Sequence, residues 1–87
     1  MATKPSFLVK MVGERLHVIL TGEWTINASS DLERAARDLL ASAHRQLKVT
    51  LDLDQIARMD TAGAWLIDRV RSDLLSHQID AEFGVTH

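Results

Sequence analysis

Hydrophobic and polar positions alternate in the first part of the chain with the two-residue period of β-strands. Residues 7–12 follow this period, and after Gly13 a second run over residues 16–20 places its apolar side chains on one face. Glycine at the first position of a two-residue turn suits the type II′ geometry that matches the twist of paired strands. The pattern therefore predicts an antiparallel hairpin, and a loop over residues 21–27, where the alternation breaks.

Two helices and two further strands follow in the pattern. Ser30 and Glu33 have the spacing of a capping box, and apolar residues recur after them every three or four positions, as on the buried face of a helix. A second helix is expected to open just after Asp60. The predicted elements are strands over residues 7–12 and 16–20, a helix over 30–43, a strand over 47–53, a helix over 61–76 and a strand over 79–85.

This order predicts an α/β domain with a mixed sheet of four strands. Strands joined through a helix normally lie parallel with right-handed crossovers, so the last three strands should be parallel and the first antiparallel to its neighbour. Polar residues load one side of the later strands, at Lys48, Thr50, Asp52, Asp80 and Glu82. Since a sheet covered on both faces has nearly continuous apolar strands, both helices should cover one face and leave the other open.

Composition excludes several classes of protein. The 87 residues make one domain, and a net charge of −2 offers no basic patch for nucleic acid. Without cysteine there is no disulfide or thiolate nucleophile, and the histidines are too scattered for a local metal motif, so we expect no metal and no cofactor. No apolar run approaches the roughly 20 residues that span a bilayer, which indicates a cytoplasmic location.

The junction before the second helix is the first candidate for function. A helix N-terminus has unpaired N–H groups and partial positive charge, so it can hold an anion or a docking loop of another protein. Asp60 and Thr61 are residue types that satisfy those donors, and the Thr61 hydroxyl is also a candidate for phosphorylation. An ordinary N-cap explains the same pair, and both interpretations stay open.

The faces of the second helix add a candidate anchor. At about 100° per residue, Leu66, Val70 and Leu74 share the stripe that must be buried. Trp65 and Asp68 then follow Thr61 on the outward face, with Arg69 at its margin. Tryptophan and arginine are enriched at binding hot spots, although Trp65 packed beneath a neighbouring loop would fit the sequence equally well.

Two motifs resemble those of STAS domains, named after sulfate transporters and anti-sigma factor antagonists. The family signature is a strand ending Leu-Asp-Leu, an aliphatic linker residue, and a hydrophobic residue before Asp-Ser/Thr-X-Gly at a helix start. It is matched here by Leu51-Asp52-Leu53, Ile56, Met59 and Asp60-Thr61-Ala62-Gly63, and upstream by Leu20-Thr21-Gly22-Glu23. The order of elements matches as well, so the resemblance covers nearly the whole chain.

The resemblance implies a non-catalytic interaction domain. In anti-sigma antagonists the hydroxyl residue after the aspartate is phosphorylated by a partner kinase, and that position is Thr61 here. Another branch works with ABC transporters for phospholipid traffic, where the matching threonine lies against the ATPase subunit. The stretch from Asp60 to Leu66 is most similar to STAS-like domains fused to the permeases of those systems.

We therefore expect a regulatory domain that docks on the ATPase subunit and permease of a phospholipid-type ABC transporter, at the cytoplasmic face of the inner membrane. The expected contact residues are Asp60, Thr61, Trp65, Asp68 and Arg69, with Trp24 flanking them. The alternative is an anti-sigma factor antagonist switched at Thr61 by its kinase.

Two departures from the family pattern affect these expectations. Antagonists usually have Ser-Ser-Gly after the aspartate, whereas this chain has Thr61-Ala62-Gly63. The family normally continues past its fourth strand with a helix, a strand and a terminal helix, so residues 1–87 are expected to be a shortened domain or the N-terminal domain of a longer chain.

Two weaker alternatives remain. An enzyme would require the carboxylates Asp52, Asp54 and Asp60 to converge with strongly perturbed pKa values. A small-ligand site would require the open face of the sheet to bind a nucleotide or lipid.

Overall fold

The predicted hairpin forms one edge of the sheet. In the computed structural model, which describes residues 4–43 and 45–84, β1 (Ser6–Val12) pairs antiparallel with β2 (Arg15–Trp24). Val12 lies opposite Arg15, so the turn between them contains two residues, and its first residue, Gly13, has a φ of 63°. Glu14, the second residue of the turn, does not have a positive φ, and this combination is the type II′ geometry that the glycine predicted.

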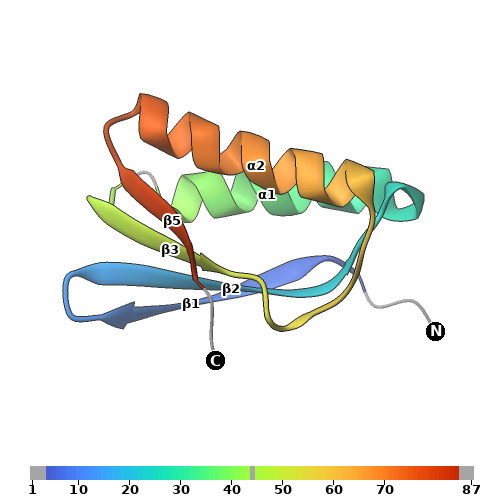
Figure 1. The fold of residues 1–87 in the computed structure, drawn as a ribbon, viewed down its shortest axis with the longest axis horizontal. Helices are drawn as coiled ribbons and strands as arrows, with labels where there is room; N and C mark the ends of the chain where they lie inside the picture. The colour runs from blue at the N-terminus through green and yellow to red at the C-terminus, as the bar shows by residue number, and fades with distance from the viewer. Residues whose placement is uncertain (1–3, 44, 85–87) are drawn as a thin grey trace.

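Strand β2 is the central strand of the sheet and, among the described residues, pairs with three other strands (Figure 1). Its first half pairs in parallel with β3 (Lys48–Asp52), and its end pairs in parallel with β4 (Ile56–Met59). Beyond β3 lies β5 (Asp80–Gly84), again parallel, so the order is β1-β2-β3-β5 with β4 beside the end of β2. The parallel arrangement of the later strands is confirmed, but within residues 4–43 and 45–84 the sheet has five strands instead of the four predicted.

The fifth strand also corrects the predicted loop over residues 21–27. Strand β2 continues to Trp24 because β4 supplies the backbone partners for Gly22, Glu23 and Trp24. Gly22 occupies a buried position of β2 with a φ of 83°, at a shift in the pairing register. A glycine at a core position hides the apolar alternation, and a partner strand of four residues is too short to show a period of its own.

Both helices lie on one side of the sheet, as predicted (Figure 1). A 3₁₀ turn, η1 (Ile26–Ala28), leads into α1 (Ser29–Ala43), which begins one residue before the expected cap at Ser30. The second helix, α2 (Thr61–Ser76), has Asp60 as its N-cap. The core between helices and sheet is formed by Leu16, Val18, Leu20, Trp24, Leu32, Ala35, Ala36, Leu39, Ala43, Val49, Leu51, Ile67, Val70, Leu74, Ile79 and Ala81.

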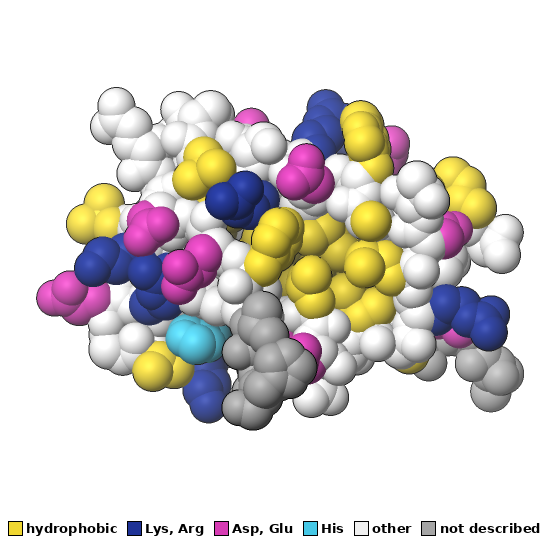
Figure 2. Space-filling model, viewed as in Figure 1, with side chains coloured by type: hydrophobic (Ala, Val, Ile, Leu, Met, Phe, Trp, Pro, Cys, Tyr) yellow, Lys and Arg dark blue, Asp and Glu magenta, His cyan; other side chains and the backbone are white. Residues whose placement is uncertain are grey.

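The opposite face of the sheet carries a small charged network. The guanidinium of Arg15 lies 3.1 Å from Asp80 Oδ2 and 3.4 Å from Glu82 Oε1, and it also donates to the carbonyl oxygen of Val49 at 3.2 Å. These contacts place a polar layer over β3 and β5, as the sequence predicted for the uncovered face. Figure 2 shows a different surface, on which apolar side chains gather between α2 and the strands below it.

Candidate functional site

Asp60 joins three segments at the start of α2. Its Oδ1 accepts a hydrogen bond from the N–H of Gly63 at 3.0 Å, which caps the helix. Its Oδ2 accepts from the N–H of Ile26 at 2.9 Å, and its own N–H donates to the carbonyl oxygen of Trp24 at 3.3 Å. Both carboxylate oxygens therefore have partners within the chain, and their role here is to hold α2 against the end of β2 and η1.

The same hydrogen bonds favour the ionised form of this carboxylate. The N–H of Ile26, followed by that of Gly63, holds the pKa of Asp60 below its ordinary value. A general acid or base working near neutral pH needs a raised carboxylate pKa instead. Asp60 is therefore suited to capping and not to proton transfer.

Gly63 allows α2 to approach β2 closely. A Cβ built at this position would overlap the carbonyl oxygen of Trp24 and would also lie 3.0 Å from the Trp24 Cβ. Gly63 is itself buried on the core face of the helix. The glycine of the Asp-Thr-Ala-Gly motif thus has a steric cause, since any side chain would push the helix start away from the strand.

Thr61 and Trp65 lie one turn apart on the exposed side of α2. Thr61 is the first residue of the helix and is exposed, and Trp65 is 62% exposed. The Cζ atom of Arg69 lies 5.5 Å from the centroid of the Trp65 ring, within range of a cation–π contact. Asp68 is exposed beside them. The structure therefore brings together the predicted residues of α2 and exposes Trp65 as the helical phase indicated.

Two further apolar residues lie beside the helix start. Ile26, whose N–H contacts the Asp60 carboxylate, is 61% exposed, and Met59, directly before Asp60, is 43% exposed. We call the surface formed by Ile26, Met59, Thr61 and Trp65 the α2-start surface. Sequence reasoning missed Ile26 and Met59 as surface residues because their positions depend on the long-range pairing of β4 and the reach of Asp60 to η1.

Trp24, predicted to flank the contact surface, is a core residue. Its exposed fraction is 0%, and its Nε1 donates to the carbonyl oxygen of Thr21 at 2.9 Å. The prediction that Trp24 faces a partner is wrong for this conformation, because the continuation of β2 places its side chain beneath the helices. Its place at the edge of the site belongs to Ile26.

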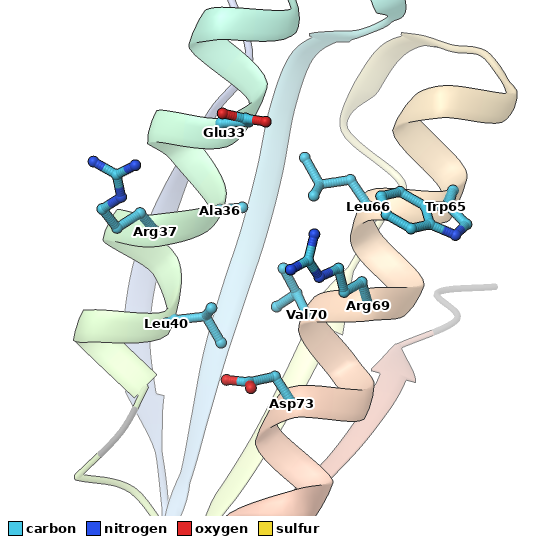
Figure 3. Close-up of a pocket in the computed structure, with 9 residues that line it drawn as sticks. All are labelled: Glu33, Ala36, Arg37, Leu40, Trp65, Leu66, Arg69, Val70 and Asp73. Carbon is cyan, nitrogen blue, oxygen red and sulfur yellow. The ribbon is translucent and has the colours of Figure 1, made fainter.

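A hollow of about 380 Å³ lies between α1 and α2, next to Trp65 (Figure 3). Leu40 of α1 and Leu66 and Val70 of α2 form its apolar part. Glu33 points into the space between the helices from α1, and Asp73 points into it from α2, whereas Arg37 points away. The hollow thus continues the exposed side of α2 as a shallow groove with charges of both signs.

The described residues offer little for catalysis. Two of the carboxylates named in the enzyme alternative have structural roles: Asp52 Oδ1 accepts from the N–H of Asp54 at 2.9 Å, in the turn between β3 and β4, and Asp60 is the cap of α2. In the part of the chain that the structure describes, no three His, Asp or Glu side chains group in a way that could hold a metal ion. Within the same residues, no helix is long and apolar enough to cross a membrane.

A sheet covered by helices on one face, with a helix starting in Asp-Thr-Ala-Gly beside the end of a parallel strand, defines a class of small α/β domains. The model of the family described as "Mlab, STAS domain" matches residues 7–79, and the chain belongs to this STAS family. A comparison with curated protein sequences gives no match.

Solved structures agree on the fold. The chain is similar to Mglu, with a TM-score of 0.67 and 22% identity over 92% of this chain and 19% of that one. It is similar to an anti-sigma factor antagonist from Mycobacterium paratuberculosis, with a TM-score of 0.68 and 16% identity over 91% of this chain and 65% of that one.

The third similar protein is the anti-sigma factor antagonist SpoIIAA. Its unphosphorylated form matches with a TM-score of 0.60 and 20% identity, over 90% of this chain and 71% of that one. The phosphorylated form of the Bacillus protein matches with a TM-score of 0.61 and 19% identity, over 87% and 68%. At these identities the likeness defines the fold: a mixed sheet with two helices of the antagonist type.

Proposed function

We propose that this chain is a regulatory STAS domain of the anti-sigma antagonist type, which binds a partner protein through the α2-start surface and is switched by phosphorylation of Thr61. The observation that carries the proposal is the exposure of Thr61 beside Trp65, on a helix start whose own cap, Asp60, is fully engaged within the chain. Capping thus leaves the Thr61 side chain free for another role. The family and the similar antagonists are regulatory and non-catalytic, which supports an interaction domain.

Phosphorylation at this position would act on the partner more than on the fold. A phosphate adds about −1.5 to −2 charges at pH 7, and the positive end of a helix tolerates negative charge. The phosphate would be attached one helical turn before Trp65, since Cβ atoms of residues four apart on a helix, here Thr61 and Trp65, lie about 5–6 Å from each other. A partner that packs on the apolar side chains of the α2-start surface would have to bury an unpaired phosphate, which excludes it.

Similarity to SpoIIAA supports a phosphorylation switch that leaves the fold unchanged. That protein has been solved in unphosphorylated and phosphorylated forms, and both match this chain with similar TM-scores, 0.60 and 0.61. A switch that preserves the fold fits an exposed hydroxyl at the first residue of a helix.

The test uses glutamate as a charge mimic at Thr61 and a matched control on the same helix. The domain, Thr61→Glu and Ser72→Glu are each co-expressed with the anti-sigma kinases of the source organism, and binding is measured with purified partners. We expect one kinase to bind the wild-type domain and Ser72→Glu equally, to lose at least about tenfold in affinity for Thr61→Glu, and to label Thr61 with phosphate. Equal binding of both variants, or phosphate on another residue, would refute the switch.

A second candidate function is docking on the ATPase subunit of an ABC transporter. The observation that favours it is the exposed Trp65 with Arg69 over its ring, which forms a large rigid anchor. Ala62, at a position where antagonists usually have a hydroxyl residue, also favours the ABC transporter candidate.

The two candidates differ in the purified partner that they require. The ATPase subunits of the source organism are tested against wild type, Trp65→Ala and Leu75→Ala, since Leu75 is an exposed apolar residue of α2 far from the helix start. Binding of an ATPase that is lost only with Trp65→Ala, without any kinase labelling of Thr61, would replace the antagonist proposal with the transporter one.

A further inference from the structure

The free edge of β1 is an interaction surface outside the proposed docking site. β1 is at the end of the strand order and pairs only with β2 among the described strands, so one side of its backbone is open (Figure 1). Its seven residues, Ser6–Val12, are mostly apolar and exposed, with Lys10 as the one charged side chain. A long, mostly apolar edge pairs readily with a further strand in a register that does not bring its charged residues together.

The hairpin fixes which backbone groups face the open side. A two-residue hairpin closes on a hydrogen-bonded pair, here Val12 and Arg15, and hydrogen-bonded pairs then alternate along an antiparallel ladder. Ser6, Leu8, Lys10 and Val12 therefore direct their N–H and C=O groups to β2. Phe7, Val9 and Met11 direct theirs to the free edge.

We infer that β1 pairs with β1 of a second copy of this chain, antiparallel, about a two-fold axis at Val9. A two-fold axis perpendicular to the sheet keeps each face of the sheet on the same side, so opposed residues must have side chains on the same face. Because side chains alternate between faces along a strand, the axis must then lie between a residue and its own copy. Centring on Val9 pairs all seven residues of β1 and joins Val9 to Val9, and Phe7 to Met11, which are the residues whose backbone groups face the edge.

Other registers are less favourable. Centring on Lys10 would place two lysines directly opposite each other, and like charges at opposed positions destabilise a sheet. Centring on Leu8 would bring Pro5 opposite Met11, and proline has no N–H to donate.

The side chains agree with the Val9 register. Helix α1 lies over the beginning of β1, where Phe7 and Ala35 line a common hollow, but Val9 and Met11 remain 48% and 52% exposed on the same face. The two-fold axis would place Phe7 of each copy opposite Met11 of the other, and Val9 against Val9. Each copy would thus cover the apolar residues that its own α1 leaves open.

The other edge of the sheet does not suit self-pairing. β5 carries Asp80 and Glu82, so two-fold pairing about Ala81 or Glu82 would oppose acidic side chains. β1 is therefore the edge suited to a second copy. β4 and the start of α2 are not next to the free edge of β1, so this dimer leaves Thr61 and Trp65 accessible. The dimer can therefore be tested independently of the proposed function.

The first test measures mass against concentration by sedimentation equilibrium, over roughly 1 µM to 1 mM, a range that covers weak association. Val9→Pro removes an N–H that faces the edge without removing a bond to β2, and Val9→Lys places a charge at the axis. We expect the wild type and the control Leu75→Lys to dimerise with the same dissociation constant, and both Val9 variants to raise that constant at least about tenfold. Circular dichroism checks that the variants stay folded.

The second test fixes the register by cross-linking. The chain has no cysteine, so Val9→Cys gives a single thiol that would face its own symmetry copy at the Cα separation of about 5.5 Å that a disulfide accommodates. Met11→Cys is the control, since the two copies of Met11 would lie far from the axis. We expect mild oxidation to cross-link Val9→Cys and not Met11→Cys. A wild type that stays monomeric at 1 mM, a dimer indifferent to both Val9 variants, or equal cross-linking of the two cysteine variants would overturn the inference.

Discussion

Trp24 and Trp65 lie on opposite sides of the junction between the end of β2 and the start of α2, and they differ in their surroundings. Trp24 ends β2 and is wholly buried, whereas Trp65 is in the second turn of α2 and is 62% exposed. Gly63 stands between them in the chain and packs against the backbone of Trp24. The comparison teaches that this motif has an inner side that fixes the helix start and an outer side that is available to a partner.

The inner side depends on a few contacts that reinforce one another. The Trp24 carbonyl oxygen accepts from the N–H of Asp60, and the Asp60 carboxylate accepts from Ile26 and Gly63. The outer side has one ring contact, from Arg69 to Trp65. Substitutions on the inner side should therefore reduce stability, and, under the proposed function, those on the outer side should reduce partner binding.

The largest loss of stability is expected for Trp24→Ala. Truncating a fully buried tryptophan removes its apolar burial and leaves a cavity, which costs about 3–5 kcal/mol. In a domain of this size that is a large share of the total stability. Urea unfolding followed by circular dichroism measures the loss. A Trp24→Ala variant within about 1 kcal/mol of wild type would show that the ring is not packed as described.

Gly63→Ala comes next and tests the close approach of α2 to β2. Helix propensity alone would make alanine more favourable than glycine by about 1 kcal/mol. Here the added Cβ would overlap the Trp24 carbonyl oxygen, so we expect a net destabilisation of about 1–3 kcal/mol. Ala64→Gly, at an exposed position of the same turn, is the control for propensity. If Gly63→Ala raised the free energy of unfolding, the steric account would be refuted.

The outer side of this comparison could be predicted from the sequence, and much of the inner side could not. The outward direction of Trp65 follows from the helical period, because residues four apart from Thr61 share its face. The cap at Asp60 follows from residue type and position. Both depend on neighbours within one turn, so local rules are sufficient.

Trp24 depends on a partner far away in the chain. Its burial requires β4, which begins at Ile56 and pairs with the end of β2 across a register shift. Four residues cannot show a period, and Gly22 interrupts the apolar pattern of β2 at a core position. The fold class and the parallel order were predictable because they follow from the alternation of longer elements, whereas this last strand and its tryptophan were not.

Asp60→Asn should have a smaller effect, and it should depend on pH. The pKa of Asp60 is lowered by the N–H groups of Ile26 and Gly63, so its ionised form is favoured in the folded state. Such a carboxylate stabilises the fold above its unfolded pKa, about 3.9, and this stabilisation is lost as the pH falls through the lower folded value. Asparagine still caps a helix but has no charge to lose.

Unfolding of wild type and Asp60→Asn is therefore compared from pH 7 downward. We expect wild type to be more stable at neutral pH and the difference to shrink below about pH 4. Asp38→Asn, which removes an exposed carboxylate on α1, is the control for the general effect of charge. If the difference in free energy of unfolding between wild type and Asp60→Asn stayed constant as the pH fell below about 4, the charge of Asp60 would not contribute to stability.

The smallest effect on stability is expected for Trp65, and its fluorescence gives the sharpest contrast with Trp24. Replacing an exposed side chain usually changes stability by less than about 0.5 kcal/mol, so the free energy of unfolding of Trp65→Phe should be close to that of wild type. Since Trp65 is exposed and Trp24 is buried, we expect Trp65→Phe to remove the emission that acrylamide quenches and to leave a blue-shifted, protected tryptophan. If quenching were unchanged, Trp65 would be shielded, and the outer side of the junction would offer a partner no aromatic anchor.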